Sequence, residues 1–137
     1  MIMILGFKKQ FVDKILNGTK IHTIREDRNN RWKTGNKIHF ATGIRTRNYN
    51  QFYQGTCKLV QDIEIIHTTG YTQIFIDGNS YFDVFHHGFD NIYEYTQLLK
   101  EFAINDGFDT VESFFEWFDQ DFKGKLIHWT DFEYLPF

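Results

Sequence analysis

The sequence has almost no cysteine or proline and no long apolar run. Its 137 residues include one cysteine, Cys57, and one proline, Pro136. A single cysteine forms no internal disulfide, which excludes a disulfide-stapled secreted module and a zinc site built from thiolates. The apolar opening at residues 1–5 is far shorter than the ~20 residues of a membrane span and has no signal-peptide features. We therefore expect a soluble cytoplasmic protein with no membrane partner.

Linkers, internal repeats and low-complexity tracts are also missing, so residues 1–137 are expected to form a single domain. The chain is 42% hydrophobic and 24% charged, which is typical of globular proteins. A chain of this length buries roughly two-thirds of its unfolded surface. Its stability must therefore come from the packing of one core.

Basic residues are scarce in the second half of the chain. Residues 59–137 carry 3 Lys and Arg against 15 Asp and Glu, a net charge of −12, whereas residues 1–58 carry 12 against 3, a net charge of +9. The two halves either neutralise each other in the fold or leave a basic face for an anionic partner. We favour the anionic partner.

Apolar spacing predicts the elements of the first half. Residues 1–5 are expected to form a buried strand, and the four-residue spacing of Phe7, Phe11 and Ile15 predicts a short helix ended by Gly18. Polar loops are expected at 26–35 and 43–51. Extended segments are expected at 19–25, at 36–42 and, as one long strand or a bent pair, at 52–66.

The second half combines strands with two helical patterns. A strand is expected at 71–76, closed by a turn at Asp77-Gly78, and residues 80–89 give no assignment. A helical stripe begins at Ile92, includes Tyr95 and stops near residue 107. Helical spacing from Val111 to Phe118 also predicts a helix that Gly124 ends, with Asp109 and Glu112 as its capping box, and alternation predicts a last strand at 126–134.

Strands at both ends, one early helix and two late helices predict an α+β protein. The expected architecture is a small antiparallel or mixed β-barrel flanked by about three helices.

The densest polar stretch covers residues 18–25. It contains a possible nucleophile in Thr23, a possible base in Lys20 or His22, and an anion-binding group in Arg25. The alternative is a solvated basic strand and loop without a site.

Three segments together carry a family resemblance: ILNGTKIHTIRED at 15–27, WKTGNKIHF at 32–40 and LLKEFAINDGFDTVESFFEWF at 98–118. They contain a helix ending in Gly, a Lys-x-x-Thr-x-Arg segment, a Lys-x-Gly turn before a strand, and a late helix with an acid before Gly-Phe. Over most of its length the chain resembles the ASCH domain family, a relative of the PUA fold.

The resemblance implies a PUA-like barrel whose cleft binds RNA, a nucleotide or a nucleoside. One branch of the family hydrolyses the amide of N(4)-acetylcytidine with a Lys, a Thr and a Glu. The matching positions here are Lys20, Thr23 and Asp106, the last one methylene shorter than Glu. Glu101 would point about 140° away from Asp106 on a helix and is a poor substitute.

A lysine removes the threonine proton only when it is neutral. Its pKa must therefore fall by about three units from a reference of about 10.4. Burial lowers that pKa, as do neighbouring cations such as Arg25, Lys8 or Lys9. An ionised Asp106 raises it, so we expect Asp106 to exchange protons with the leaving amine.

The spacing of the two reactive residues adds a constraint. In a regular strand Lys20 and Thr23 would point to opposite faces. A shared site therefore requires a turn or bulge after Gly18.

Single-stranded nucleic acid is held by cations and stacked on aromatic rings. The expected RNA-binding or substrate-binding residues are Arg25, Arg28, Arg31, Trp32, Lys33, Arg45 and Arg47. The alternative for Trp32 is a place in the core.

Two other functions stay open. One is a non-catalytic RNA-binding or regulatory module, in which the same cations hold phosphate. The other is a ribonuclease, for which His22 or His39 would serve. The histidine spacing predicts no metal site, and no cofactor is expected.

Overall fold

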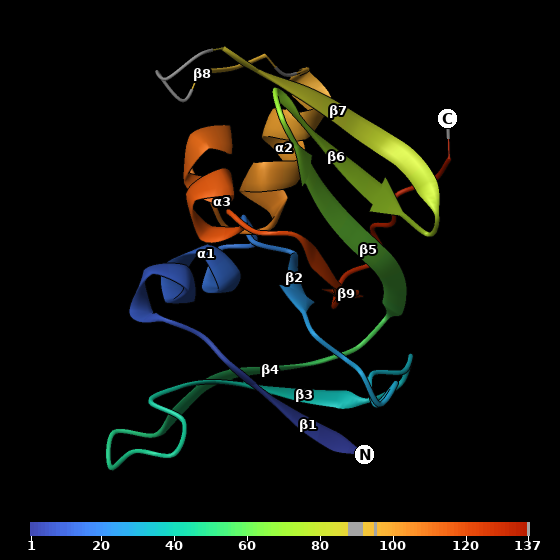
Figure 1. The fold of residues 1–137 in the computed structure, drawn as a ribbon. Helices are drawn as coiled ribbons and strands as arrows, with labels where there is room; N and C mark the ends of the chain where they lie inside the picture. The colour runs from blue at the N-terminus through green and yellow to red at the C-terminus, as the bar shows by residue number, and fades with distance from the viewer. Residues whose placement is uncertain (88–91, 95, 137) are drawn as a thin grey trace.

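The computed structural model describes residues 1–87, 92–94 and 96–136 (Figure 1). In chain order its elements are β1 (Ile2–Gly6), the 3-10 turn η1 (Lys9–Phe11), α1 (Val12–Leu16), β2 (His22–Arg25), β3 (Lys37–Thr42), β4 (Asn50–Thr56), β5 (Leu59–Thr68), β6 (Tyr71–Ile76), β7 (Asn79–His87), β8 (Ile92–Glu94), α2 (Gln97–Asn105), α3 (Val111–Trp117) and β9 (Phe122–His128).

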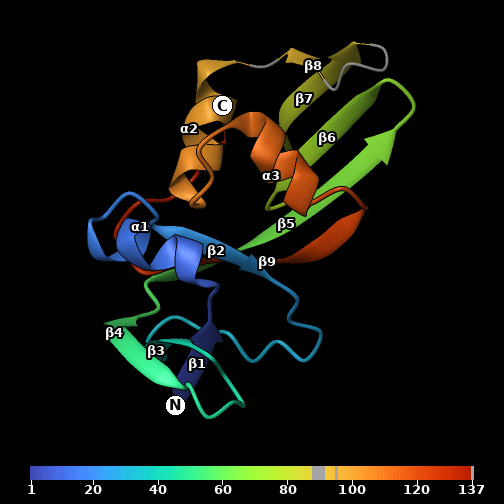
Figure 2. The same ribbon diagram turned by 90° about the vertical axis from the view of Figure 1, so that its left-hand side faces the viewer.

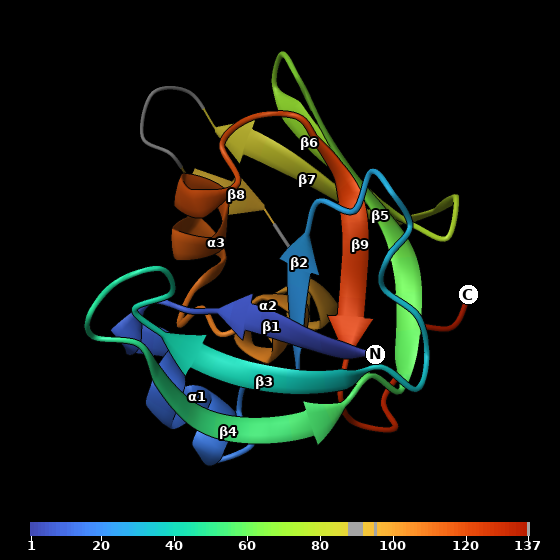
Figure 3. The same cartoon turned by 90° about the horizontal axis from the view of Figure 1, so that it is seen from below.

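The strands form two sheets, which confirms the predicted α+β class. One sheet has the order β1-β3-β4, with β1 and β3 parallel; the other has the order β2-β9-β5-β6-β7-β8 and is antiparallel throughout. Within the described residues no strand pair joins the two sheets, so they do not close into one hydrogen-bonded barrel. Figure 3 shows the three-stranded sheet lying across one end of the larger sheet.

The helices α2 and α3 cover one face of the six-stranded sheet (Figure 2). Phe102 of α2 and Phe114 of α3 are fully buried there, with ring centroids 5.5 Å apart. Burying such a ring stabilises the fold by about 2–3 kcal/mol. The core continues to Ile38 and Phe40 of the smaller sheet, so one core supports both sheets.

The long apolar segment predicted at 52–66 is a bent pair of strands. β4 belongs to the small sheet and β5 to the large one, and buried Cys57 lies at the bend. The unassigned segment 80–89 is β7 up to His87. The turn predicted at Asp77-Gly78 is confirmed, since both residues have positive φ, 51° and 79°, as a tight hairpin requires.

The helix predicted from Ile92 is wrong at its start, because Ile92–Glu94 pairs with β7 as a strand. Tyr95 lies outside the described residues. α2 begins after Thr96, whose hydroxyl accepts a hydrogen bond from Leu99 N. Apolar spacing alone does not separate a short edge strand from the first turn of a helix.

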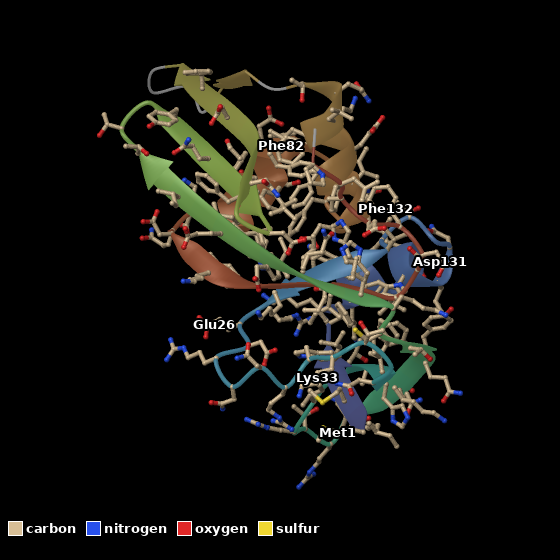
Figure 4. The ribbon with its side chains drawn as sticks, turned by 90° about the vertical axis from the view of Figure 1, so that its right-hand side faces the viewer. Met1, Glu26, Lys33, Phe82, Asp131 and Phe132 are labelled. Atoms are coloured by element: carbon tan, nitrogen blue, oxygen red, sulfur yellow. The ribbon has the colours of Figure 1, made fainter. Side chains whose placement is uncertain are left out.

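Other boundaries also differ from the prediction: α3 ends at Trp117, well before Gly124, and β2 begins at His22 rather than at residue 19. The capping box of α3 is formed by Thr110 and Ser113, one residue later than expected. The last strand is β9 and ends at His128, after which residues 129–136 have no regular structure. Figure 4 shows Asp131 and Phe132 of this terminal segment on the opposite side of the molecule from Glu26.

The connection between α1 and β2 positions the first polar motif. Gly18 has a φ of +81° and ends α1, as predicted. Lys20 N then donates to Lys14 O, and Ile21 N donates to Asn105 O at the end of α2, each at 2.9 Å. Lys20 therefore lies before β2, between two helix ends. In the described part of the chain, no helix is both long and apolar enough to span a membrane.

Candidate active site

A cleft of about 570 Å³ opens between the end of β1, β2 and the ends of α2 and α3. Its lining includes four predicted site residues, Lys20, Thr23, Arg25 and Asp106. Lys20 precedes β2, and the chain turns after Gly18 as the shared site requires. The three-residue spacing of Lys20 and Thr23 is thus compatible with one site. Thr23 lies in β2 and follows its alternation, whereas Lys20 lies before the strand and does not.

Lys20 is the most buried cation of the cleft, with 2% of its surface exposed. Its Nζ donates to the carbonyl oxygens of His22, at 2.8 Å, and of Asp106, at 2.5 Å. The Asp106 carboxylate oxygen Oδ1 is 3.6 Å from Lys20 Nζ. Lys20 Nζ also lies over the Phe11 ring, 5.1 Å from the ring centre.

The pKa of Lys20 falls to about 8 in this environment. Burial is the largest cause, because it penalises the charged amine. The charge of Asp106 opposes the shift, while the nearby charges of Arg25 and Lys14 assist it. Arg25 was expected in this role, but the second cation is Lys14 rather than Lys8 or Lys9.

Arg25 orients the Thr23 hydroxyl. Its Nε donates to Thr23 Oγ1 at 3.4 Å, and its Nη2 donates to Gly6 O at 2.6 Å. The guanidinium also lies 4.8 Å from the centre of the Phe7 ring. A fixed cation beside a hydroxyl can stabilise negative charge that develops on it or on a bound carbonyl.

Asp106 reaches Lys20 because the next residue is glycine. Gly107 has a φ of +97°, and an added Cβ would lie 2.7 Å from Lys20 Cδ and 2.8 Å from Phe11 Cδ1. Asp106 Oδ1 is 3.1 Å from His22 Nδ1. Glu101, on the same helix, is exposed and lines a different cleft.

His22 is the neighbour of Thr23 but faces the core. It is fully buried, and its Nε2 is 2.7 Å from the hydroxyl of Tyr134. Burial lowers its pKa from the usual value. His22 is not among the residues that line the Lys20 cleft, so Lys20 is the better placed base.

The other predicted binding residues lie in two loops on opposite sides of the small sheet (Figures 1 and 3). Loop 26–35 carries exposed Arg28, Arg31 and Lys33, whereas Trp32 is half-buried against the core. Arg28 lines a separate cleft of about 860 Å³, and its Nε lies 3.8 Å from Glu26 Oε2. These residues are not brought together with Lys20.

Arg45 and Arg47 are exposed in the loop between β3 and β4. The start of that loop, Gly43 and Ile44, lines the Lys20 cleft. Neither arginine lines the cleft itself.

Sequence reasoning missed two contributors. Trp117, 45% exposed, lines the cleft, and Lys8 Nζ lies 5.2 Å from its ring centre. Tyr134 contacts His22 from 112 positions away, and no spacing signal connects two such residues.

Among the residues that the structure describes, no three His, Cys, Asp or Glu side chains are grouped so as to hold a metal ion. Fold and site together define a small α+β protein with a buried lysine, a threonine and an aspartate at one cleft. Comparisons with models of known families, with curated proteins and with solved structures find no match.

Proposed function

We propose that the cleft binds a nucleoside, free or within single-stranded RNA, and hydrolyses the amide of N(4)-acetylcytidine, in an ASCH-type domain with a PUA-like arrangement of its two sheets. The observation that carries the proposal is a buried lysine of lowered pKa in the same cleft as a threonine hydroxyl. A lysine that is partly neutral near pH 8, in one cleft with a threonine hydroxyl, is suited to nucleophilic catalysis.

In the proposed reaction Thr23 Oγ1 attacks the acetyl carbonyl carbon while neutral Lys20 takes the hydroxyl proton. The carbonyl electron pair moves to oxygen, and the Arg25 guanidinium stabilises the resulting charge. The C–N bond then breaks, and the amine leaves as cytidine with a proton supplied through the Lys20–Asp106 pair. Water hydrolyses the acetyl-threonine ester and releases acetate.

The lowered pKa of Lys20 gives the activity a pH dependence. With a pKa of about 8, roughly a tenth of Lys20 is neutral at pH 7. The value of kcat/KM should therefore rise about tenfold between pH 7 and pH 9.5 and then level off. A flat profile over this range would exclude Lys20 as the base.

The direct test incubates the protein with N(4)-acetylcytidine and measures cytidine and acetate. Thr23→Ala and Lys20→Met should each lower kcat at least about 100-fold, because each removes a reacting group. Thr19→Ala is the matched control, since Thr19 is exposed and is not among the cleft residues. No turnover by the wild-type protein at high concentration contradicts the hydrolase proposal.

A non-catalytic RNA-binding module is the second candidate, and the exposed arginines of the loop whose start lines the cleft favour it. If Arg45 and Arg47 bind phosphates, replacing both with Gln should reduce the salt slope of single-stranded RNA affinity by about 1.4, at about 0.7 per phosphate. The matched pair Arg31→Gln and Lys33→Gln tests whether RNA extends to the opposite loop. The ribonuclease alternative lacks such support, since His22 is buried in the core.

A further inference from the structure

A chain of buried and partly buried hydrogen bonds runs behind Asp106, away from the cleft. Asn105 Nδ2 lies 3.2 Å from the Tyr134 hydroxyl, which lies 2.7 Å from His22 Nε2. His22 Nδ1 then lies 3.1 Å from Asp106 Oδ1. The chain therefore connects the irregular C-terminal segment with the carboxylate that faces Lys20.

The chemistry of the groups decides which atom donates and which accepts in each of these hydrogen bonds. The amide nitrogen of Asn105 only donates, so the Tyr134 oxygen accepts there and uses its own proton elsewhere. Burial raises the pKa of Tyr134 and lowers that of His22, which keeps the phenol protonated and the imidazole neutral. Tyr134 thus donates to His22 Nε2, and the single imidazole proton lies on Nδ1, toward Asp106.

We propose that Tyr134 and His22 are positioning residues of the active site, which hold the Asp106 side chain fixed beside Lys20 by favouring the Nδ1–H tautomer of His22. This inference rests on the proposed function for its catalytic consequence. With the other tautomer a nitrogen lone pair would face the Asp106 oxygen, the hydrogen bond would be lost, and the side chain would no longer be held in this position.

The C-terminal segment is held firmly enough to serve this role. The buried side chain of Gln61 binds both backbone groups of Tyr134: Nε2 donates to Tyr134 O at 2.9 Å, and Oε1 accepts from Tyr134 N at 3.1 Å. The hydroxyl of Tyr81 donates to Leu135 O. Gln61 of β5 and Tyr81 of β7 therefore hold in place a segment that has no regular structure of its own.

The test replaces the hydroxyl that imposes the tautomer. In Tyr134→Phe, His22 Nε2 loses its donor while Asp106 Oδ1 still accepts from Nδ1, so the His22 side-chain ¹⁵N spectrum should change from the Nδ1–H pattern of the wild type to a mixture of the two tautomers. On N(4)-acetylcytidine, kcat should fall 10- to 100-fold while KM changes less than twofold, because neither His22 nor Tyr134 lines the cleft. Tyr81→Phe is the matched control: it removes a hydroxyl that binds the same segment, and it should keep the tautomer and kcat of the wild type.

An Nε2–H imidazole in the wild type overturns the inference, and so does an unchanged tautomer in Tyr134→Phe. If the tautomer changes but kcat does not, the positioning role fails while the proposed hydrolase stands. If the wild type does not hydrolyse the substrate, the proposed function fails, and the tautomer comparison still decides the structural part. Should Tyr134→Phe not fold, the wild-type spectrum decides alone.

Discussion

Gly107 is the residue on which the close approach of Asp106 to Lys20 depends. Its positive φ disfavours any other residue, and its missing Cβ leaves room for the stem of Lys20 and the ring of Phe11. The position thus combines a conformational and a packing requirement. The family resemblance includes this glycine, and the structure supplies its physical reason.

Gly107→Ala should lower the free energy of unfolding by about 2–4 kcal/mol, measured by urea denaturation, because it adds overpacking to backbone strain. Gly70→Ala is the control. Gly70 has a φ of +88° with open space around its Cβ, so it should lose only about 1 kcal/mol for the backbone. Equal losses of unfolding free energy in the two variants would show that the close contacts of an added Cβ at position 107 with Lys20 and Phe11 do not destabilise the fold.

His22 and Thr23 show how adjacent residues separate into different environments. Because β2 begins at His22, strand alternation sends the imidazole into the core and the hydroxyl toward the cleft. Their residue types made both candidates for the site, Thr23 as a nucleophile and His22 as a base. Only the start of the strand decided which of them faces the cleft.

Among the elements, α3 tests how much a helix cap contributes here. The Thr110 hydroxyl accepts from Ser113 N at 3.0 Å, and Ser113 Oγ accepts from Thr110 N at 3.2 Å. The cap holds the helix whose Phe114 fills the core. The loss of the cap should therefore affect the stability of the whole fold.

Thr110→Ala should reduce the free energy of unfolding by about 1 kcal/mol, the usual contribution of an N-cap side chain. Thr69→Ala in the exposed turn between β5 and β6 is the control and should change it by less than about 0.5 kcal/mol. Thermal and urea denaturation measure both. A Thr110→Ala protein as stable as the control would show that the capping box contributes nothing.

At the scale of the whole molecule, the two oppositely charged halves meet at few ion pairs. In the described part of the chain, the pairs between Lys or Arg of the first half and acids of the second join Lys14 to Asp109 at 2.7 Å and Lys20 to Asp106 at 3.6 Å. Arg45 and Arg47 remain exposed. The two halves therefore pair at the end of α1 and in the cleft, while the loop arginines stay exposed.

Buried histidines should make the fold sensitive to acid. His128 has no exposed surface, and burial, with a contribution from nearby His22, lowers its pKa to about 3. Between about pH 6.5 and pH 3 the unfolded chain therefore binds a proton that the folded chain does not, so stability falls as the pH falls.

His128 alone should reduce the free energy of unfolding by about 2 kcal/mol between pH 7 and pH 5. In His128→Gln, whose amide can still donate to Gln61 Oε1, this part of the decrease should disappear. Urea denaturation at several pH values measures the difference. Parallel stability curves for the two proteins would contradict the assignment.

The sequence by itself determined the α+β class, the single core, the helix-ending Gly18 and the hairpin turn at Asp77-Gly78, because local spacing and glycine conformation govern these features. It also indicated Lys20, Thr23 and Asp106 as one set, through the family resemblance. Edge strand β8 and the end of β9 were missed, since pairing partners rather than local pattern decide them.

Only the tertiary structure decided which polar residues share an environment. Burial of Lys20 between two helix ends, the approach of Asp106 allowed by Gly107, and the contact of Tyr134 with His22 all depend on segments distant in the chain. The pKa of a buried group depends on its desolvation and on its neighbours, so it follows from packing rather than from the motif. The single cysteine already indicated a fold held by packing rather than by disulfides, and the same packing forms the candidate site.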